Sequence, residues 1–420
     1  MHVHGSFRRI CRIASGVSVL VALLAAPAGA QEPIKIGFGM SLTGQLAPNG
    51  KSALLGMKIW EEDVNAKGGL IGRPVKLVYY DDQSNPSTVP GLYAKLLDID
   101  RVDLIMGGYA TVMLAPAIGL AKERNKLFPG LFGTGVNSQL NYDKYFAMIP
   151  TGPDPKPAFT KPFFEVAMAQ DPKPQTISLA AADAEFGRNV CEGARDNAKA
   201  AGLKIVYDKT YPPTSTDFAP IVRAVQATNP DIAVFCSYPL DSVGLVRSIS
   251  EIGFKPKIVG GAMVGLQATV FKLQLGPLLN GITNYETWVP AKTMEYPGVN
   301  EFLTKYQARA GAEKVDPLGY YLGTWGYAYV QLLEQAIKGA NTVNEEKLAD
   351  YFRSATFKTI MGDVQFGKQG EWTQSRFLVV QYHGIKSNDL DQFRGMATQN
   401  ILGPKEFATG KLIYPYEKAK

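Results

Sequence analysis

The 420-residue sequence predicts an α/β fold made of two similar lobes. Strand-like and helix-like segments alternate from residue 34 to residue 106, and prolines crowd the stretch 150–157 before the same alternation restarts at residue 176. Alternating strands and helices favour a mostly parallel sheet with helices on both faces. The length also suits two lobes of roughly 150 to 200 residues each better than one core.

The first half of the pattern begins with a buried strand expected at 34–38. A helix with an apolar stripe follows at 52–66, and the glycine pair at 68–69 ends it. We then expect a strand at 75–80, a helix at 87–97 and a strand at 104–106.

The second half repeats this order after the prolines. We expect strands at 176–180, 204–207 and 232–236, and helices at 185–201 and 218–226. Long helical patterns fill the segment from about 298 to 351. Residues 386–420 are polar with few periodic apolar positions, so we expect an extended tail that lies over the body.

Residues 1–30 have the pattern of an export signal. Arginines at 8, 9 and 12 form a basic start, 17–26 is a short apolar run, and Ala-Gly-Ala at 28–30 is a small-residue cleavage site. The apolar run is too short to span a bilayer, and no later stretch reaches roughly 18 apolar residues. We therefore expect a soluble exported protein whose mature chain begins at Gln31.

Composition excludes several classes of protein. Apolar residues make up 46% and aromatic residues 10% of the chain, which excludes a disordered protein. Without the three arginines of the leader the formal net charge is only +3, with no basic runs, which argues against a nucleic-acid partner. His383 is the one histidine of the mature chain, so we expect no multi-histidine metal site and no cofactor.

The mature chain keeps two cysteines, Cys191 in a helical pattern and Cys236 in an apolar strand. An oxidising compartment permits a disulfide between them. Sequence does not give their separation, and we expect two buried free thiols.

Glycines and hydroxyl residues follow the first predicted strand at 39–44. Backbone N–H groups there can approach an anion, and Ser41 and Thr43 can donate to a carboxylate. Leu42 stands where a third glycine is needed, so the segment is not a dinucleotide fingerprint. The segment is either a carboxylate-binding loop or a plain tight turn.

Other candidate loops also follow predicted strands, where open α/β sheets bind ligands. These loops are 107–111, 133–136, 183–187, 237–241 and 260–264. Phe186 and Tyr238 are positioned either to stack on a ligand or to pack in the ordinary way.

The sequence contains no convincing catalytic constellation. Ser41 is not in a GxSxG elbow, and His383 lies in a late strand-like segment. The acids at 81–82 are better explained as loop residues that cap the following turn. We therefore expect a binding protein rather than an enzyme.

Several motifs in this order resemble one family. They are Ile34 to Gly37 leading to Ser41-Leu42-Thr43-Gly44, Asn65 to Gly69 with Gly72 and Pro74, Tyr80-Asp81-Asp82 with Asn85-Pro86, Asp183 to Gly187, Thr216-Asp217-Phe218 leading to Asn229-Pro230-Asp231, and Met361-Gly362 with Val364 to Gly370. Over roughly residues 32 to 385, the chain resembles the leucine-binding-like type I solute-binding proteins of bacterial ABC transporters.

The resemblance implies two Rossmann-like lobes joined by a three-crossover hinge, with the ligand between them. The implied divisions are a signal peptide at 1–30, lobe 1 at 31–150 plus about 288–362, lobe 2 at 151–287 plus about 363–385, and a tail at 386–420, with crossovers near 150–155, 284–291 and 360–375. It also implies a periplasmic location, an ABC permease partner, a small carboxylate ligand and a monomer.

The family's amino-acid site has a carboxylate half and an ammonium half. The positions of this chain that correspond to ligand-binding residues are Ser41, Thr43, Gly44, Tyr109, Ala110, Thr111, Thr134, Val136, Phe186, Tyr238, Ala262 and Met263.

This chain departs from the family at the ammonium half. The family has an acidic residue after the strand that ends near Gly260, whereas here Gly261-Ala262-Met263 follow. A buried ammonium without a counter-charge would cost several kcal/mol, so we hypothesise that the ligand lacks one and is an aromatic or aliphatic acid. A branched-chain amino acid stays open if Asp183, Glu185 or Asp241 supplies the acid, as do short amides and urea-like ligands.

Three functional classes compete. A binding protein that delivers its ligand to a permease is favoured. A ligand-sensing receptor would use the same fold, but no signalling domain follows in the sequence. An exported hydrolase would need a nucleophile beside a base, and we identify none.

Overall fold

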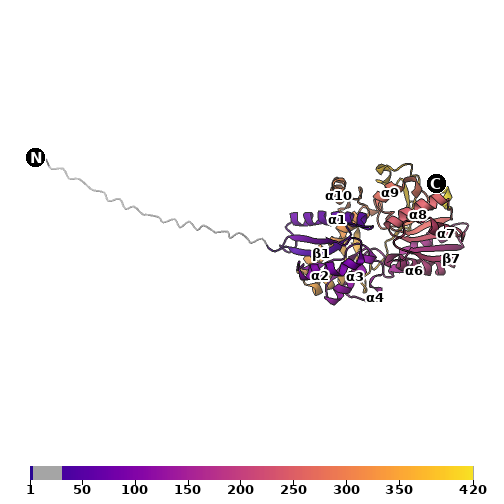
Figure 1. Ribbon diagram of the computed structural model, residues 1–420. Coiled ribbons are helices and arrows are strands. Elements are labelled where there is room, and N and C mark those ends of the chain that lie inside the picture. The colour runs from indigo at the N-terminus through magenta and orange to yellow at the C-terminus, as the bar shows by residue number, and fades with distance from the viewer. Residues whose placement is uncertain (3–30, 420) are drawn as a thin grey trace.

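The computed structural model describes residues 1, 2 and 31–419. The predicted leader lies almost entirely outside these residues, so the export signal stays a prediction. Figure 1 shows two bodies of sheet and helix side by side, which we call the first and second body. The fold is therefore α/β with mostly parallel sheets, as the alternating pattern predicts.

The first body is built around the early strands. Strand β1 lies between β2 and β3, and all three are parallel. A hydrogen bond of 2.7 Å from Gly107 N to Pro129 O continues the order to β4 and its parallel partner β5. The elements are β1 (Ile34–Met40), α1 (Ala47–Ala66), β2 (Val75–Asp81), α2 (Val89–Asp98), β3 (Leu104–Ile105), α3 (Thr111–Glu123), β4 (Phe128–Leu131), α4 (Asn137–Leu140) and β5 (Tyr145–Met148).

The segment from about residue 299 returns to the first body. Helix α11 packs along α1, where Trp60 Nε1 donates to Glu334 at 2.7 Å. The hydroxyls of Ser52 on α1 and Tyr306 on α10 lie 2.7 Å apart. The elements are α10 (Val299–Glu313), α11 (Leu322–Ala340), α12 (Glu345–Ser354) and the small hairpin of β11 (Phe357–Thr359) and β12 (Gly362–Val364).

The second body contains a sheet in the order β14-β13-β10-β9-β8-β6-β7. The strands from β7 to β10 are parallel, while β13 and β14 are each antiparallel to the preceding neighbour. The elements are α5 (Pro155–Met168), β6 (Thr176–Ala182), α6 (Glu185–Ala200), β7 (Lys204–Tyr211), α7 (Ala219–Gln226), β8 (Ile232–Ser237), α8 (Pro239–Ile252), β9 (Ile258–Met263), α9 (Thr269–Leu275), β10 (Thr283–Glu286), β13 (Leu378–Tyr382) and β14 (Gln399–Gly403).

The chain crosses between the bodies after β5, after β10 and between β12 and β13. The residues at which one lobe gives way to the other stay a prediction. One expectation about the C-terminal segment is wrong. Residues 386–420 are not simply an extended tail over the body, because β14 within this segment forms the edge strand of the large sheet. A strand of five residues carries too little periodic signal to be recognised in a polar segment.

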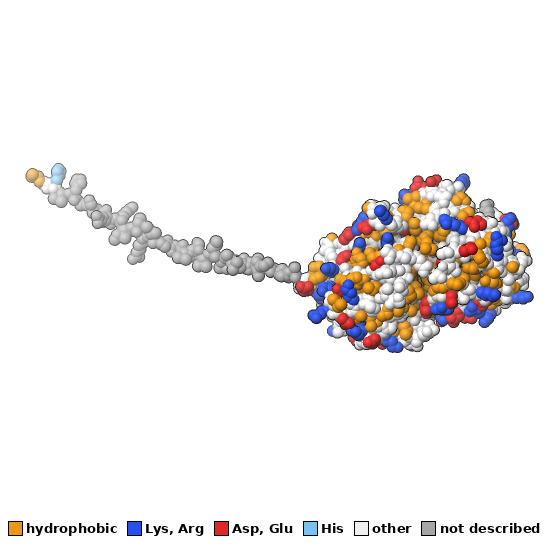
Figure 2. Space-filling model, in the orientation of Figure 1, with side chains coloured by type: hydrophobic (Ala, Val, Ile, Leu, Met, Phe, Trp, Pro, Cys, Tyr) orange, Lys and Arg blue, Asp and Glu red, His pale blue; other side chains and the backbone are white. Residues whose placement is uncertain are grey.

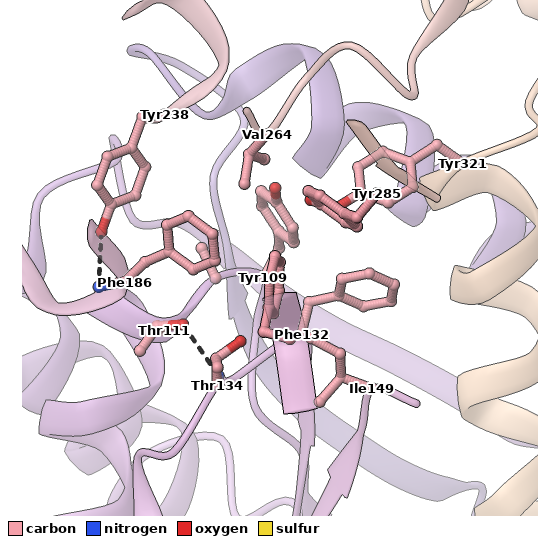
Figure 3. Close-up of a pocket in the computed structure, with 12 residues that line it drawn as sticks. Tyr109, Thr111, Phe132, Thr134, Ile149, Phe186, Tyr238, Val264, Tyr285 and Tyr321 are labelled. Carbon is pink, nitrogen blue, oxygen red and sulfur yellow. Dashed lines mark hydrogen bonds between the residues drawn. The ribbon is translucent and has the colours of Figure 1, made fainter. Parts of the chain in front are cut away.

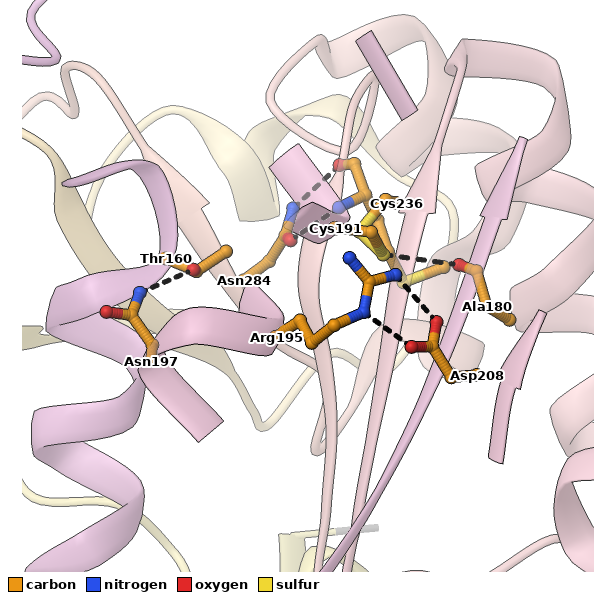
Figure 4. The surroundings of a disulfide bond; sticks show 9 residues. Thr160, Ala180, Cys191, Arg195, Asn197, Asp208, Cys236 and Asn284 are labelled. Carbon is orange, nitrogen blue, oxygen red and sulfur yellow. Dashed lines mark hydrogen bonds and ion pairs between the residues drawn. A yellow bond between two sulfur atoms is a disulfide. The ribbon is translucent and has the colours of Figure 1, made fainter. Parts of the chain in front are cut away.

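The expectation of two free thiols is also wrong, because Cys191 and Cys236 form a disulfide with a Cα–Cα distance of 5.9 Å. Helix α6 packs over β6 and β8 and places Cys191 directly above the strand that carries Cys236 (Figure 4). The ion pair between Arg195 and Asp208 ties the exposed side of the same helix to β7. The sequence predicts the helix and the strand, but not which helix covers which strand.

Among the residues that the structure describes, no helix is both long and apolar enough to cross a membrane. Figure 2 shows basic and acidic side chains interspersed over the face in view.

Candidate functional site

A pocket whose empty space, including the part open to solvent, is about 310 Å³ lies between the two bodies. We call it the cavity. Four of its lining residues, Phe132, Ile149, Tyr238 and Val264, directly follow strands, at the carboxyl ends where parallel sheets bind ligands (Figure 3). The lining residues are Tyr109, Ala110, Thr111, Phe132, Thr134, Ile149, Phe159, Phe186, Tyr238, Val264, Tyr285 and Tyr321.

The first body contributes a polar wall of two threonines. The backbone N of Thr134 donates to Thr111 Oγ1 at 3.0 Å, which orients the side chain of Thr111 (Figure 3). Thr134 is fully buried, and its own hydroxyl has no hydrogen-bond partner within the described part of the chain. A buried polar atom left unpaired costs about 1 to 3 kcal/mol, so its retention here points to a partner supplied from outside.

The N-terminus of α3 adds to this polar wall. Thr111 is the first residue of the helix, and Met113 N already donates to Ala110 O at 3.0 Å. The N–H groups of Thr111 and Val112 have no acceptor within the helix, as is usual at a helix start. Ala110, which precedes it, has φ of 83°, a conformation that an alanine rarely adopts. A helix N-terminus beside the unpaired hydroxyl of Thr134 and the hydroxyl of Thr111, whose proton remains available, forms a site for an anion such as a carboxylate.

The second body contributes an aromatic wall. Phe186 lies edge-to-face against Phe159 and Tyr238, with ring centroids 5.4 and 5.8 Å apart. Tyr238 Oη accepts a hydrogen bond from Phe186 N at 3.2 Å. Beside this wall, Asn189 Nδ2 donates to Thr134 O at 2.9 Å, which joins α6 of the second body to the threonine loop of the first.

Three tyrosine hydroxyls, which we call the tyrosine cluster, gather at another part of the cavity. They belong to Tyr109, Tyr285 and Tyr321, and the hydroxyl of Tyr321 lies close enough to the other two to interact with them. Burial raises the pKa of Tyr109 to about 12, and it holds the pKa values of Tyr285 and Tyr321 well above their usual range. All three therefore stay neutral.

None of the residues that line the cavity is charged, as far as the structure describes the chain. The acids considered from the sequence all lie elsewhere. Asp183 and Glu185 pair with Arg188 at the surface, at 3.0 and 3.7 Å. Asp241 accepts from the hydroxyl of Tyr211 at 3.1 Å, and burial raises the pKa of Asp241 to about 6.

The loop after β1 does not line this cavity, so a ligand contact at Ser41, Thr43 or Gly44 stays a prediction. The hydroxyl of Ser41 donates to Asp82 Oδ1 and that of Thr43 to Asp81 Oδ2, both at 2.7 Å. Gly44 has φ of 80° and makes a turn that leads into α1. The hydroxyls are used within the fold, because β1 and β2 are parallel neighbours and their ends lie side by side.

Three further predicted residues also lie outside the wall. Val136 is buried at the start of α4, and Ala262 and Met263 are fully buried in β9. Both backbone groups of Met263 bond the side chain of Asn284, at 3.0 and 2.8 Å. Val264, the next residue, lines the cavity in their place.

Tyr109, Ala110, Thr111, Thr134, Phe186 and Tyr238 are the predicted residues that the structure brings to one cavity. Sequence reasoning missed Phe132, Ile149, Phe159, Tyr285 and Tyr321, and it included Val264 only as the last residue of the candidate loop 260–264. Phe132 and Val264 end apolar strand patterns, a signal that could have identified them. Tyr321 begins a helix more than 200 residues from Tyr109, and no local pattern connects the two.

A family model described as periplasmic binding protein matches residues 33–387. Leu/Ile/Val-binding protein homolog 8 of Brucella suis biovar 1 is 26% identical over 396 residues, which cover 90% of this chain and 95% of the relative. Homolog 7 of Brucella melitensis biotype 1 is 26% identical over 304 residues, covering 70% and 74%.

Solved structures share the fold. A leucine binding protein from Thermotoga maritima superposes with a TM-score of 0.73 at 18% identity, covering 88% of this chain and 97% of its own. A branched-chain amino acid transporter substrate binding protein from Streptococcus pneumoniae, in complex with isoleucine, gives 0.71 at 20% identity, covering 85% and 97%. A solute binding protein of an ABC transporter from Rhodopseudomonas palustris BisB5, in complex with 3,4-dihydroxy benzoic acid, gives 0.71 at 16% identity, covering 84% and 94%.

Proposed function

Because the chain belongs to the periplasmic binding protein family, we propose that it captures a small aromatic or other apolar carboxylate between its two bodies and delivers it to an ABC permease. Members of the family bind solutes, so the chain is a binding protein rather than an enzyme. We propose that it acts in the periplasm, after export by the predicted leader, and that it is a monomer.

The observation that carries the proposal concerns the described residues: the hydroxyl of Thr134 is unpaired among them, and none of those that line the cavity is charged. A carboxylate at this position would accept from that hydroxyl, from Thr111 and from the first N–H groups of α3. Hydrogen bonds to a charged group are worth about 1.5 to 3 kcal/mol each, so this arrangement supports an anionic ligand.

The neutral walls argue against an amino acid. An ammonium group enclosed by Phe159, Phe186 and Val264 would lose its hydration and find no carboxylate. An apolar ring or chain meets no such cost and gains from burial against the same side chains. The solved relatives include proteins bound to isoleucine and to 3,4-dihydroxy benzoic acid, so both ligand classes occur on this fold.

Binding would favour the closed arrangement of the two bodies. The ligand would contact Thr134 of the first body and Phe186 of the second, so its affinity for the closed form would exceed that for an open form. The permease would then recognise the closed shape.

The test is thermal unfolding of the mature chain, residues 31–420, after ligand carried over from expression has been removed by unfolding and refolding. The panel contains benzoate, phenylpyruvate, leucine, phenylalanine and urea. A ligand at 100 times its Kd adds about 2.7 kcal/mol of stability, so a true ligand raises the unfolding temperature measurably. We expect the acids to stabilise the protein and the amino acids to have no effect; stabilisation by leucine alone would contradict the proposal.

A further inference from the structure

The cavity has a second polar end, formed by the tyrosine cluster. Tyr285 and Tyr321 lie on the side of the cavity opposite Thr111 and Thr134 (Figure 3). Between these ends the walls are aromatic or aliphatic. A ligand that lies across the cavity with its carboxylate at the threonines would therefore bring its far end to the tyrosines.

The tyrosine cluster has hydrogen-bonding capacity that the fold does not use. Each phenol hydroxyl has one donor and two acceptor sites. Tyr109 Oη accepts from Asn49 Nδ2 at 2.9 Å, and Tyr321 interacts with Tyr109 and Tyr285. Three hydroxyls offer three donors and six acceptor sites, so this network leaves both donors and acceptors available to a ligand.

The chemistry of the cluster suits a neutral polar group. The hydroxyls stay protonated, so the cluster has no negative charge with which to balance an ammonium. A hydroxyl group, in contrast, can donate to one tyrosine oxygen and accept from another. The enclosed position makes such bonds selective, because an apolar group placed there would leave buried hydroxyls unpaired.

The cluster also joins the two bodies. Tyr109 follows β3 and Tyr321 begins α11, both in the first body, while Tyr285 belongs to β10 of the large sheet. A ligand group bonded to Tyr109 and Tyr285 together would be held fully only when the bodies are closed.

We propose that the tyrosine cluster recognises a hydroxyl at the end of the ligand opposite its carboxylate, so that the chain selects hydroxylated aromatic acids over unsubstituted ones. This inference rests on the proposed function, since it takes the carboxylate to lie at Thr111 and Thr134. Tyr285 is the specificity-determining residue, because it brings the hydroxyl of the second body to the cluster.

The experiment is isothermal titration calorimetry of the stripped mature chain with benzoate, 4-methylbenzoate and 4-hydroxybenzoate. The methyl group has about the size of the hydroxyl but makes no hydrogen bond. We expect 4-hydroxybenzoate to bind about tenfold more tightly than 4-methylbenzoate. Tyr285→Phe should abolish this preference, so that the ratio of the two affinities falls from about ten to about one.

Tyr207→Phe on β7 serves as the matched control, because Tyr207 is half-buried and lies outside the cavity. Circular dichroism shows whether Tyr285→Phe folds. If it does not, Tyr321→Phe replaces it, and it should likewise weaken the preference for 4-hydroxybenzoate over 4-methylbenzoate. Equal binding of 4-methylbenzoate and 4-hydroxybenzoate by the unmodified protein would overturn the inference and leave the proposed function standing. Failure of all three acids to bind would overturn both.

Discussion

Two buried polar regions lie on opposite faces of strand β10 and differ in how their polar groups are satisfied. Tyr285 lines the cavity, and the next residue, Glu286, points to the other face, as successive residues of a strand do. There Glu286 Oε1 accepts from Lys272 Nζ at 3.3 Å and from Tyr382 Oη at 3.2 Å. We call these three residues the ionic cluster.

The charged groups of the ionic cluster are paired within the fold, whereas the cavity retains an unpaired polar group. Both charges of the ionic cluster are almost fully buried and are paired with each other. The cavity contains no charge, and the hydroxyl of Thr134 has no partner among the described residues. Burial alone therefore does not separate these two regions; they differ in that the cavity retains unused hydrogen-bonding capacity and the ionic cluster does not.

Breaking the ionic cluster should give the largest effect on stability. Lys272→Met leaves Glu286 buried without its cation, and we expect a loss of about 3 to 5 kcal/mol in the free energy of unfolding, measured in urea at pH 7. Burial already raises the pKa of Glu286, so in this variant the folded state should bind the extra proton and stability should recover as the pH falls.

The double variant Lys272→Met with Glu286→Gln is the control, because it removes both charges and leaves a neutral amide. It should regain more than half of the lost stability. A single variant that costs less than about 1 kcal/mol would contradict the description of a completed cluster.

Glu371 provides an intermediate case, since it is a buried acid without a cation. It is 4% exposed, its Oε2 has no partner within residues 31–419, and burial raises its pKa to about 8. The hydroxyl of nearby Tyr145 is also unpaired among the described residues. Burial and the charge of Glu371 both raise the pKa of Tyr145.

The pKa of Glu371 is higher in the folded than in the unfolded state. Its contribution to stability is thus complete below about pH 4.5 and is lost as the pH rises through 8, with a slope of at most about 1.4 kcal/mol per pH unit. Glu371→Gln should remove this slope in urea titrations between pH 5 and 9. An unchanged pH profile would show that Glu371 does not titrate in this range.

The smallest effect, and the sharpest contrast, is expected at Thr134. Thr134→Val keeps the shape and removes the unpaired hydroxyl, so the free energy of unfolding should rise by about 1 kcal/mol. Affinity for the best acid of the panel should fall about tenfold or more, measured by calorimetry.

Thr160→Val is the matched control, because Thr160 is equally buried but its hydroxyl accepts from Asn197 at 3.0 Å. That substitution should lower stability and leave affinity unchanged. If both variants lose stability to the same extent, the hydroxyl of Thr134 does not differ from an ordinary buried threonine.

The strand and helix positions could be predicted closely because their signal is local. The expected strand at 75–80 is observed at Val75–Asp81, and the expected helix at 185–201 at Glu185–Ala200. The helix expected from 52 begins five residues earlier, at Ala47. A proline in its first turn favours this start. The apolar stripe, which was the signal used to predict the helix, begins only after that turn.

The site could be predicted only in part. Thr111 and Phe186 were identified because each follows a strand end, and strand ends of parallel sheets meet at one edge. Ser41 satisfied the same rule but bonds Asp82, since a hydroxyl takes whichever acceptor lies within reach.

The sequence by itself determined the alternating α/β architecture and the absence of an acid after β9, because periodicity and residue identity are properties of the chain. The tertiary structure alone decided that Cys191 meets Cys236 and that Tyr285 and Tyr321 join Tyr109. These contacts connect residues tens to hundreds of positions apart, and they depend on which helix covers which strand and on how the two bodies close. Local sequence patterns do not predict these contacts, because they are set by the packing of the whole chain.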